Sequence, residues 1–135
     1  MVNKPILTLV DAKRIAAAAE MEAQKNAWNI VIAIVDDGGH LLYLQREHDT
    51  QFGSVETAMM KAHAAVAFQR PTKMSEEAVT SGRLIHLALP GVIPAEGGLP
   101  LLVNGTVIGG IGVSGVRSFQ DGQVAAAGVA ALKAK

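Results

Sequence analysis

The sequence predicts an α+β domain in which an antiparallel sheet is flanked by helices, with long helices at the N-terminal and C-terminal ends. Three observations predict it: apolar residues at helical spacing near the start, two pairs of strand-like segments joined by turn sequences, and Ala-rich helical segments between and after them. Hairpins separated by helices form an antiparallel sheet rather than a doubly wound parallel one. The 135 residues fit one domain, 1–135.

The first predicted element is an amphipathic helix that runs to about Asn26. Thr8 suits its N-cap, and Asp11 follows at the spacing of a capping box. Asn26 is a plausible left-handed helix stop. The apolar positions repeat at i, i+3 and i+4, as a helix with one buried face requires: Ala12, Ile15, Ala16, Ala19 and Ala23.

A hairpin follows this helix. Ile30–Val35 is short, rich in β-branched residues and continuously apolar, which indicates a strand covered on both faces. Asp36–Gly39 supplies the turn, since its two glycines can adopt positive φ. His40–Gln45 returns as the second strand.

Helices occupy the middle of the chain. Ser54 can cap a helix over Val55–Gln69, and a shorter helix starts after Ser75 and ends at Gly82. The segment Leu84–Leu89 is ambiguous between strand and loop.

The last third of the chain contains the clearest hairpin. Leu99–Val103 and Thr106–Val113 are joined by Asn104-Gly105, a pair that suits a type I′ turn. A final Ala- and Val-rich helix is predicted over Gln120–Lys133.

Composition excludes several classes of function. Twelve basic residues balance twelve acidic ones without a basic stripe, so nucleic acid is not expected as a partner. There is no cysteine, which excludes disulfides and thiolate chemistry. Neither a secretory signal nor an apolar run of ~18–20 residues is visible, so we expect a cytoplasmic protein that does not cross a membrane. Half of the residues are hydrophobic but only 4% are aromatic, and this small-residue core favours burial against further copies in a homo-oligomer.

Four separated blocks resemble the GlcG/HbpS family, also known as the haem-degrading domain family, and its GlcG branch fits best. The blocks are Val35-Asp36-Asp37-Gly38-Gly39-His40-Leu41, Lys61-Ala62, Glu96-Gly97-Gly98-Leu99-Pro100, and Gly109–Gly115 followed by Asp121. The resemblance implies a five-stranded, profilin-like antiparallel sheet, assembly into dimers or rings and, in some members, binding or degradation of haem. This chain has Arg46-Glu47-His48-Asp49 where the family usually has Arg-Met-Asp.

The run Gly110–Gly115 fits G-x-G-x-x-G, the pattern of a dinucleotide-binding turn. Only twenty residues follow it, too few for the helix, strand and acidic residue that such a site needs. Close packing of a glycine-rich strand against a helix or another subunit is the better interpretation.

His63 is the first candidate for a metal ligand. It follows Met59 and Met60 on an Ala-rich helix, and haem iron is held by His or by His with Met in an apolar pocket. The alternative is a partly buried packing histidine with one hydrogen bond.

Further candidates carry polar chemistry. His48, beside Asp49, is a candidate general base, or else part of a solvated loop. Glu96 is a candidate acid/base, or a turn residue. Lys61 and Arg46 are candidates for binding an anionic group such as a propionate, although Lys61 also fits a surface lysine. The amides of Gly97 and Gly98 offer an anion nest.

These candidates support three functional hypotheses. The first is a haem- or tetrapyrrole-binding protein, with or without oxidative haem degradation. The second is a cofactor-free enzyme acting on a small carboxylated or aromatic metabolite, with His48 and Glu96 as catalytic residues. The third is a non-catalytic oligomeric accessory or sensor protein. The sequence leaves open whether the protein is an enzyme.

Overall fold

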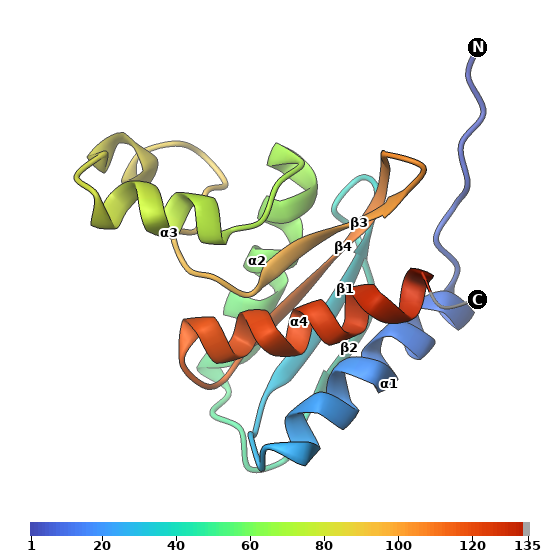
Figure 1. Cartoon of the computed structure of the whole chain (residues 1–135), viewed down its shortest axis with the longest axis horizontal. Coiled ribbons are helices and arrows are strands. Elements are labelled where there is room, and N and C mark those ends of the chain that lie inside the picture. Colours follow the sequence, from blue (N-terminus) through green and yellow to red (C-terminus); the bar gives the residue numbers. More distant parts are fainter. Residues whose placement is uncertain (134–135) are drawn as a thin grey trace.

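The computed structural model describes residues 1–133 and shows a sheet with helices on both faces (Figure 1). The N-terminal and C-terminal helices lie side by side on one face of the sheet. The elements are α1 Leu9–Lys25, β1 Val31–Asp36, β2 Leu41–Arg46, α2 Gly53–Phe68, α3 Lys73–Thr80, the 3₁₀ helix η1 Leu84–Leu87, β3 Gly98–Val103, β4 Thr106–Ser114 and α4 Ser118–Lys133.

The sheet has the strand order β2-β1-β4-β3, and every neighbouring pair is antiparallel. The two predicted hairpins are therefore adjacent, joined by the pairing of β1 with β4. Ile34 lies at the centre of the sheet, opposite Tyr43 on one side and Ile111 on the other. The predicted antiparallel sheet flanked by helices is confirmed.

The central strand β1 is buried on both faces, as its continuous apolar sequence predicted. Ile32 and Ile34 face α1 and α4, where they join the larger core cluster. Val31, Ala33 and Val35 face α2 in a second, smaller cluster. The sheet thus separates two hydrophobic cores. The larger core is covered by α1 and α4, and the smaller core is covered by α2 alone.

Glycines in β4 allow α2 to lie directly on the sheet backbone. A Cβ at Gly112 would overlap the carbonyl oxygen of Ala58, and one at Gly110 would lie 2.7 Å from the carbonyl oxygen of Ala62. Side chains here would force the helix away from the strand. The G-x-G-x-x-G run is therefore a packing feature, as its sequence context indicated.

Several local predictions are confirmed. Thr8 caps α1, its hydroxyl accepting a hydrogen bond from the Asp11 amide at 3.2 Å. Asn104 and Gly105 both have positive φ, 50° and 79°, as a type I′ turn requires. No helix in the described chain has the length and apolarity needed to span a membrane.

Three predictions are wrong. The sheet has four strands rather than five, because Leu84–Leu87 forms a 3₁₀ helix outside the sheet, between a turn at Gly82 and Pro90. Ser54 does not cap α2; it lies within the helix, is buried, and accepts a hydrogen bond from the Gln51 side chain. The left-handed residue after α1 is Ala27, with φ 58°, and not Asn26.

Candidate functional site

Lys61 and Asp121 form a buried ion pair between α2 and the first turn of α4. The Lys61 Nζ atom lies 3.1 Å from Asp121 Oδ2, and each side chain is only 3% exposed. The same ammonium donates a second hydrogen bond, 3.0 Å long, to the carbonyl oxygen of Val113 at the end of β4. Lys61 is therefore neither a surface lysine nor free to bind an external anion.

The Asp121 carboxylate is also bonded to the β4–α4 turn. Its Oδ1 accepts a hydrogen bond from the Val116 amide at 3.1 Å. Burial raises the pKa of Asp121 above its usual 3.8, while Lys61 and the backbone amides of Val116 and Gly115 act in the opposite direction. The pair thus holds three elements together: α2, the end of β4 and the start of α4.

The predicted Glu96-Gly97-Gly98 turn lies against this pair. A Cβ at Gly97 would lie 2.9 Å from Lys61 Nζ, so only glycine leaves room for the ammonium. The Gly98 amide donates to the Thr72 hydroxyl at 2.9 Å, which removes it from the expected anion nest. The Glu96 carboxylate fills the space beside Gly122 on α4.

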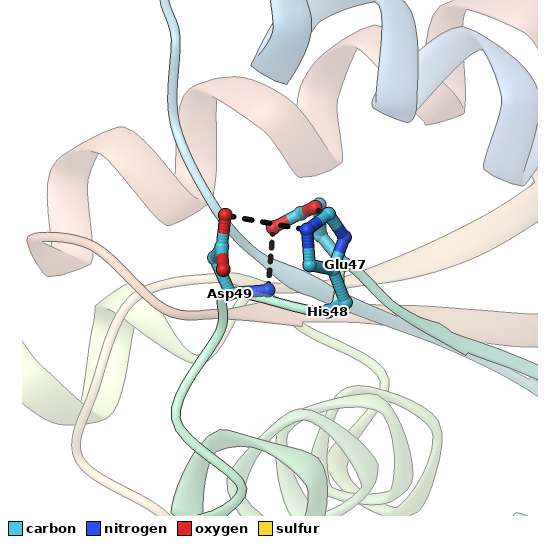
Figure 2. A group of neighbouring side chains, drawn as sticks. All are labelled: Glu47, His48 and Asp49. Atoms are coloured by element: carbon cyan, nitrogen blue, oxygen red, sulfur yellow. Dashed lines mark hydrogen bonds and ion pairs between the residues drawn. The ribbon is translucent and has the colours of Figure 1, made fainter.

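The chain turns at the end of β2, over Arg46-Glu47-His48-Asp49. Three of these residues, Glu47, His48 and Asp49, form a compact polar group (Figure 2). His48 Nδ1 lies 2.7 Å from Glu47 Oε1, and its Nε2 lies 3.4 Å from Asp49 Oδ2. The His48 side chain is 86% exposed. The three residues each offer a metal-ligating atom, all within 4.8 Å of one another, and exposed carboxylates often gather in this way without a metal.

A polar hollow of about 330 Å³ adjoins this turn. It is lined by Trp28, Asn29 and Asp49 and, on the opposite side, by Gly115 and Val116. Because the Val116 amide binds Asp121, the β4–α4 turn lies between the hollow and the buried ion pair. The structure thus brings the His48–Asp49 turn near the Lys61 region, but separates the two by backbone.

His63 lies in a different place, in an open groove of about 270 Å³ between α2 and the β1–β2 hairpin. The groove walls are mainly apolar, and the imidazole is exposed rather than packed in the core. Its ring lies against the backbone of Gly39, where a Cβ would be 2.6 Å from His63 Cδ2. The remaining lining residues are Val35, Leu41, Glu56, Met59 and Met60.

The sequence and the fold are both similar to those of known proteins. A family described as "Haem degrading protein HbpS-like" matches residues 7–130. Protein GlcG of Escherichia coli is 44% identical over 114 residues, covering 84% of this chain and 85% of GlcG. The chain belongs to the HbpS-like family.

Two solved structures of similar proteins extend this HbpS-like assignment to the fold. The Klebsiella pneumoniae protein ORFY superimposes with a TM-score of 0.88 at 31% identity, covering 100% of this chain and 99% of that one. A complex of PduOC with haem gives a TM-score of 0.84 at 32% identity, covering 94% and 95% of the two chains. A protein of the same fold therefore binds haem.

The HbpS-like sequence blocks lie close together in space, although their residues do not all form one open site. Lys61 and Asp121 come from two different blocks, and Gly97 from a third. The sequence predicted an anionic group as the partner of Lys61 but did not identify Asp121. The signal was present in the two blocks, since a buried lysine requires a partner of opposite charge.

Proposed function

We propose that this HbpS-like protein binds haem or a related tetrapyrrole in the groove between α2 and the β1–β2 hairpin, where His63 would hold the iron. The observation that carries the proposal is the exposed His63 imidazole among apolar walls, beside Met59 and Met60. The fold similarity to the PduOC–haem complex supports it. Bound haem would supply redox and ligand-binding chemistry that the side chains lack.

The groove residues fit a haem in two respects. First, the His63 imidazole is exposed and lines the groove, so a ring nitrogen can reach an iron ion bound there. Second, Gly39 provides a flat backbone surface against which the ring rests. Both features would orient the imidazole toward a ligand in the groove.

The strand beside the groove offers a binding surface for the rest of the macrocycle. Arg46 and Leu44 pair with Val31 and Ala33, whose side chains face α2, so all four lie on the same face of the sheet. Leu41 begins this row and Arg46 ends it, about 16 Å away at ~3.3 Å per residue. The row gives an apolar surface that ends at the Arg46 guanidinium. Its Nη1 donates to the carbonyl oxygen of Thr50 at 2.9 Å, and its other N–H groups would bind a haem propionate.

A haemin titration tests the proposal. We expect the wild-type protein to give a sharpened Soret band, His63→Ala to bind at least tenfold more weakly, and Arg46→Gln to lose a smaller part of the affinity. His86→Ala is the matched control, since His86 lies on η1 and belongs neither to the groove lining nor to the β2 row. A wild-type protein without a Soret shift, or an unchanged affinity in His63→Ala, would rule out the proposed site.

The polar hollow favours a second candidate function, a cofactor-free enzyme for a small polar metabolite. Trp28 offers an aromatic face, and Asn29 and Gln51 offer hydrogen bonds. His48, which precedes the lining residue Asp49 and lies 3.4 Å from its carboxylate, is a candidate acid/base. Glu96 would act only from the far side of the β4–α4 turn. Thermal melting with small carboxylated and aromatic metabolites tests this function, because a ligand of the native state raises Tm; His48→Ala should abolish turnover but not folding.

A further inference from the structure

The polar hollow beside Trp28 lies where three connections meet at one end of the sheet (Figure 1). They are the α1–β1 connection with Trp28 and Asn29, the β2–α2 connection with Asp49–Gln51, and the β4–α4 turn with Gly115 and Val116. At about 30 Å³ per water-sized group, its volume of about 330 Å³ admits on the order of ten non-hydrogen atoms. The hollow therefore has room for a small metabolite but not for a macrocycle.

The walls of the hollow are held in place by hydrogen bonds to the body of the domain. The Trp28 amide donates to the carbonyl oxygen of Ala23, near the end of α1, at 2.9 Å. The Thr50 hydroxyl donates to the carbonyl oxygen of Ile30 at 3.3 Å, and Thr50 is only 4% exposed. A hollow with walls fixed in this way is largely formed before a ligand binds.

The charge of the hollow comes from a carboxylate. Within the described part of the chain, Asp49 is the only charged residue that lines it. The Glu47 carboxylate lies beside Asp49, since its Oε2 accepts a hydrogen bond from the Asp49 amide at 2.9 Å. Arg46 and Arg117 are close by in the chain but do not line the hollow, and Arg46 Nη1 donates to the carbonyl oxygen of Thr50 at 2.9 Å. A carboxylate of a ligand would thus meet a charge of its own sign, whereas a cation would be attracted.

The neutral lining residues also suit a cation. Part of the Trp28 ring packs against the larger core and part lines the hollow, and an indole is the aromatic side chain that attracts cations most strongly. Gln51 Nε2 donates to the Ser54 hydroxyl at 3.2 Å, which leaves Gln51 Oε1 as an acceptor for a ligand. Asn29 supplies a further amide oxygen. An ammonium group has three N–H donors and no acceptor, so it matches this set of groups.

We propose that the hollow binds a small organic cation, an amine of up to about ten non-hydrogen atoms, between the Trp28 ring and the Asp49 carboxylate. Asp49 provides the opposite charge, Trp28 the aromatic face, and Gln51 and Asn29 the hydrogen bonds. The inference rests on the hollow of the second candidate function and names the class of its ligand. It does not depend on the haem groove.

The fluorescence of Trp28 tests the proposal at the hollow itself, because Trp28 is the only tryptophan in the chain. Three four-carbon molecules that differ mainly in charge are titrated at pH 7: 1,4-diaminobutane, 1,4-butanediol and succinate. We expect a saturable change with the diamine, a smaller one with the diol and none with succinate. An equal response to succinate, or no saturable response to the diamine up to about 10 mM, would overturn the proposal.

Two variants test the role of Asp49. Asp49→Asn removes the charge and should not disturb folding, because the Asp49 side chain is 69% exposed. It should bind the diamine roughly fivefold more weakly, as expected for the loss of one ion pair in contact with water. Glu77→Gln, at an exposed position on α3, is the matched control and should bind the diamine as the wild type does. Equal affinities in the two variants would refute Asp49 as the partner of the cation.

Magnesium chloride distinguishes an amine site from a general attraction of cations to carboxylates. We expect Mg²⁺ to change the Trp28 fluorescence much less than the diamine does, because a strongly hydrated ion gains little from an aromatic face. An equal change with Mg²⁺ would overturn the proposal.

The titration measures binding without turnover, so its outcome is separate from that of the candidate enzyme. Diamine binding without turnover of any amine would retain this inference and remove the enzyme. A rise in Tm with carboxylated metabolites, together with no diamine binding, would overturn this inference and leave the second candidate function in place.

Discussion

The ammonium of Lys61 and the carboxylate of Asp121 meet 3.1 Å apart in the interior, with both side chains 97% shielded from water in a chain of small apolar residues. Such a pair is not by itself a source of stability, since desolvating two charges offsets much of their attraction. Its geometry instead fixes where α4 begins relative to α2.

We expect Lys61→Met to destabilise the protein strongly. The substitution preserves most of the side-chain volume but leaves Asp121 buried without its counter-charge, a change that costs about 3–5 kcal/mol. Urea unfolding at pH 7 measures the loss. Lys13→Met, on the exposed face of α1, is the control and should change stability by no more than about 0.5 kcal/mol. A wild-type midpoint in Lys61→Met would contradict the buried pair.

Asp121 also predicts an unusual pH dependence. Because burial raises its pKa above 3.8, the folded protein binds a proton on Asp121 more readily than the unfolded chain does. In the window between pH 3.8 and the folded-state pKa, the Asp121 contribution to stability therefore decreases as pH rises. The free energy of unfolding, measured from pH 3.5 to 7, should show this slope in the wild type relative to Asp121→Asn. Parallel curves would contradict the raised pKa.

The sequence predicted the order of the elements because each is determined locally. Thr8, the Asn104-Gly105 turn and the continuous apolar run of β1 all carry their signals within a few residues. The segment Leu84–Leu89 was ambiguous because its apolar residues suit either a strand or a loop, whereas the structure places Leu84–Leu87 in a 3₁₀ helix with no buried residue. Apolarity alone does not distinguish a covered strand from an exposed helical turn.

The candidate residues of the site were harder to predict, since their roles depend on contacts between distant segments. Lys61 was identified from its block, but its burial depends on Asp121, 60 positions later. His63 lies on the same helix, two positions further along, and faces an open groove instead. Helical spacing places the two on different faces, but it does not show which face the sheet covers.

The glycines of β4 give a stability prediction with a matched control. We expect Gly112→Ala to destabilise the protein by about 1–3 kcal/mol, because the new methyl group would collide with the backbone of α2. Gly53→Ala places a methyl group in open space at the start of α2 and should be neutral or slightly stabilising. Thermal melting compares the two. Equal effects would show that α2 does not lie directly on β4.

Gly39→Ala tests whether the position of His63 matters for haem binding. The added methyl group would lie 2.6 Å from His63 Cδ2 and displace the ring, and it would also strain a residue with φ of 82°. Gly105→Ala is the matched control: its φ is similar, 79°, but nothing lies within 4 Å of the new methyl group. Both variants should lose about 1–2 kcal/mol of stability from backbone strain. Only Gly39→Ala should also weaken haemin binding, because only there does the methyl group occupy the place of the ring. Equal haemin affinities in the two variants would show that His63 does not contact the haem.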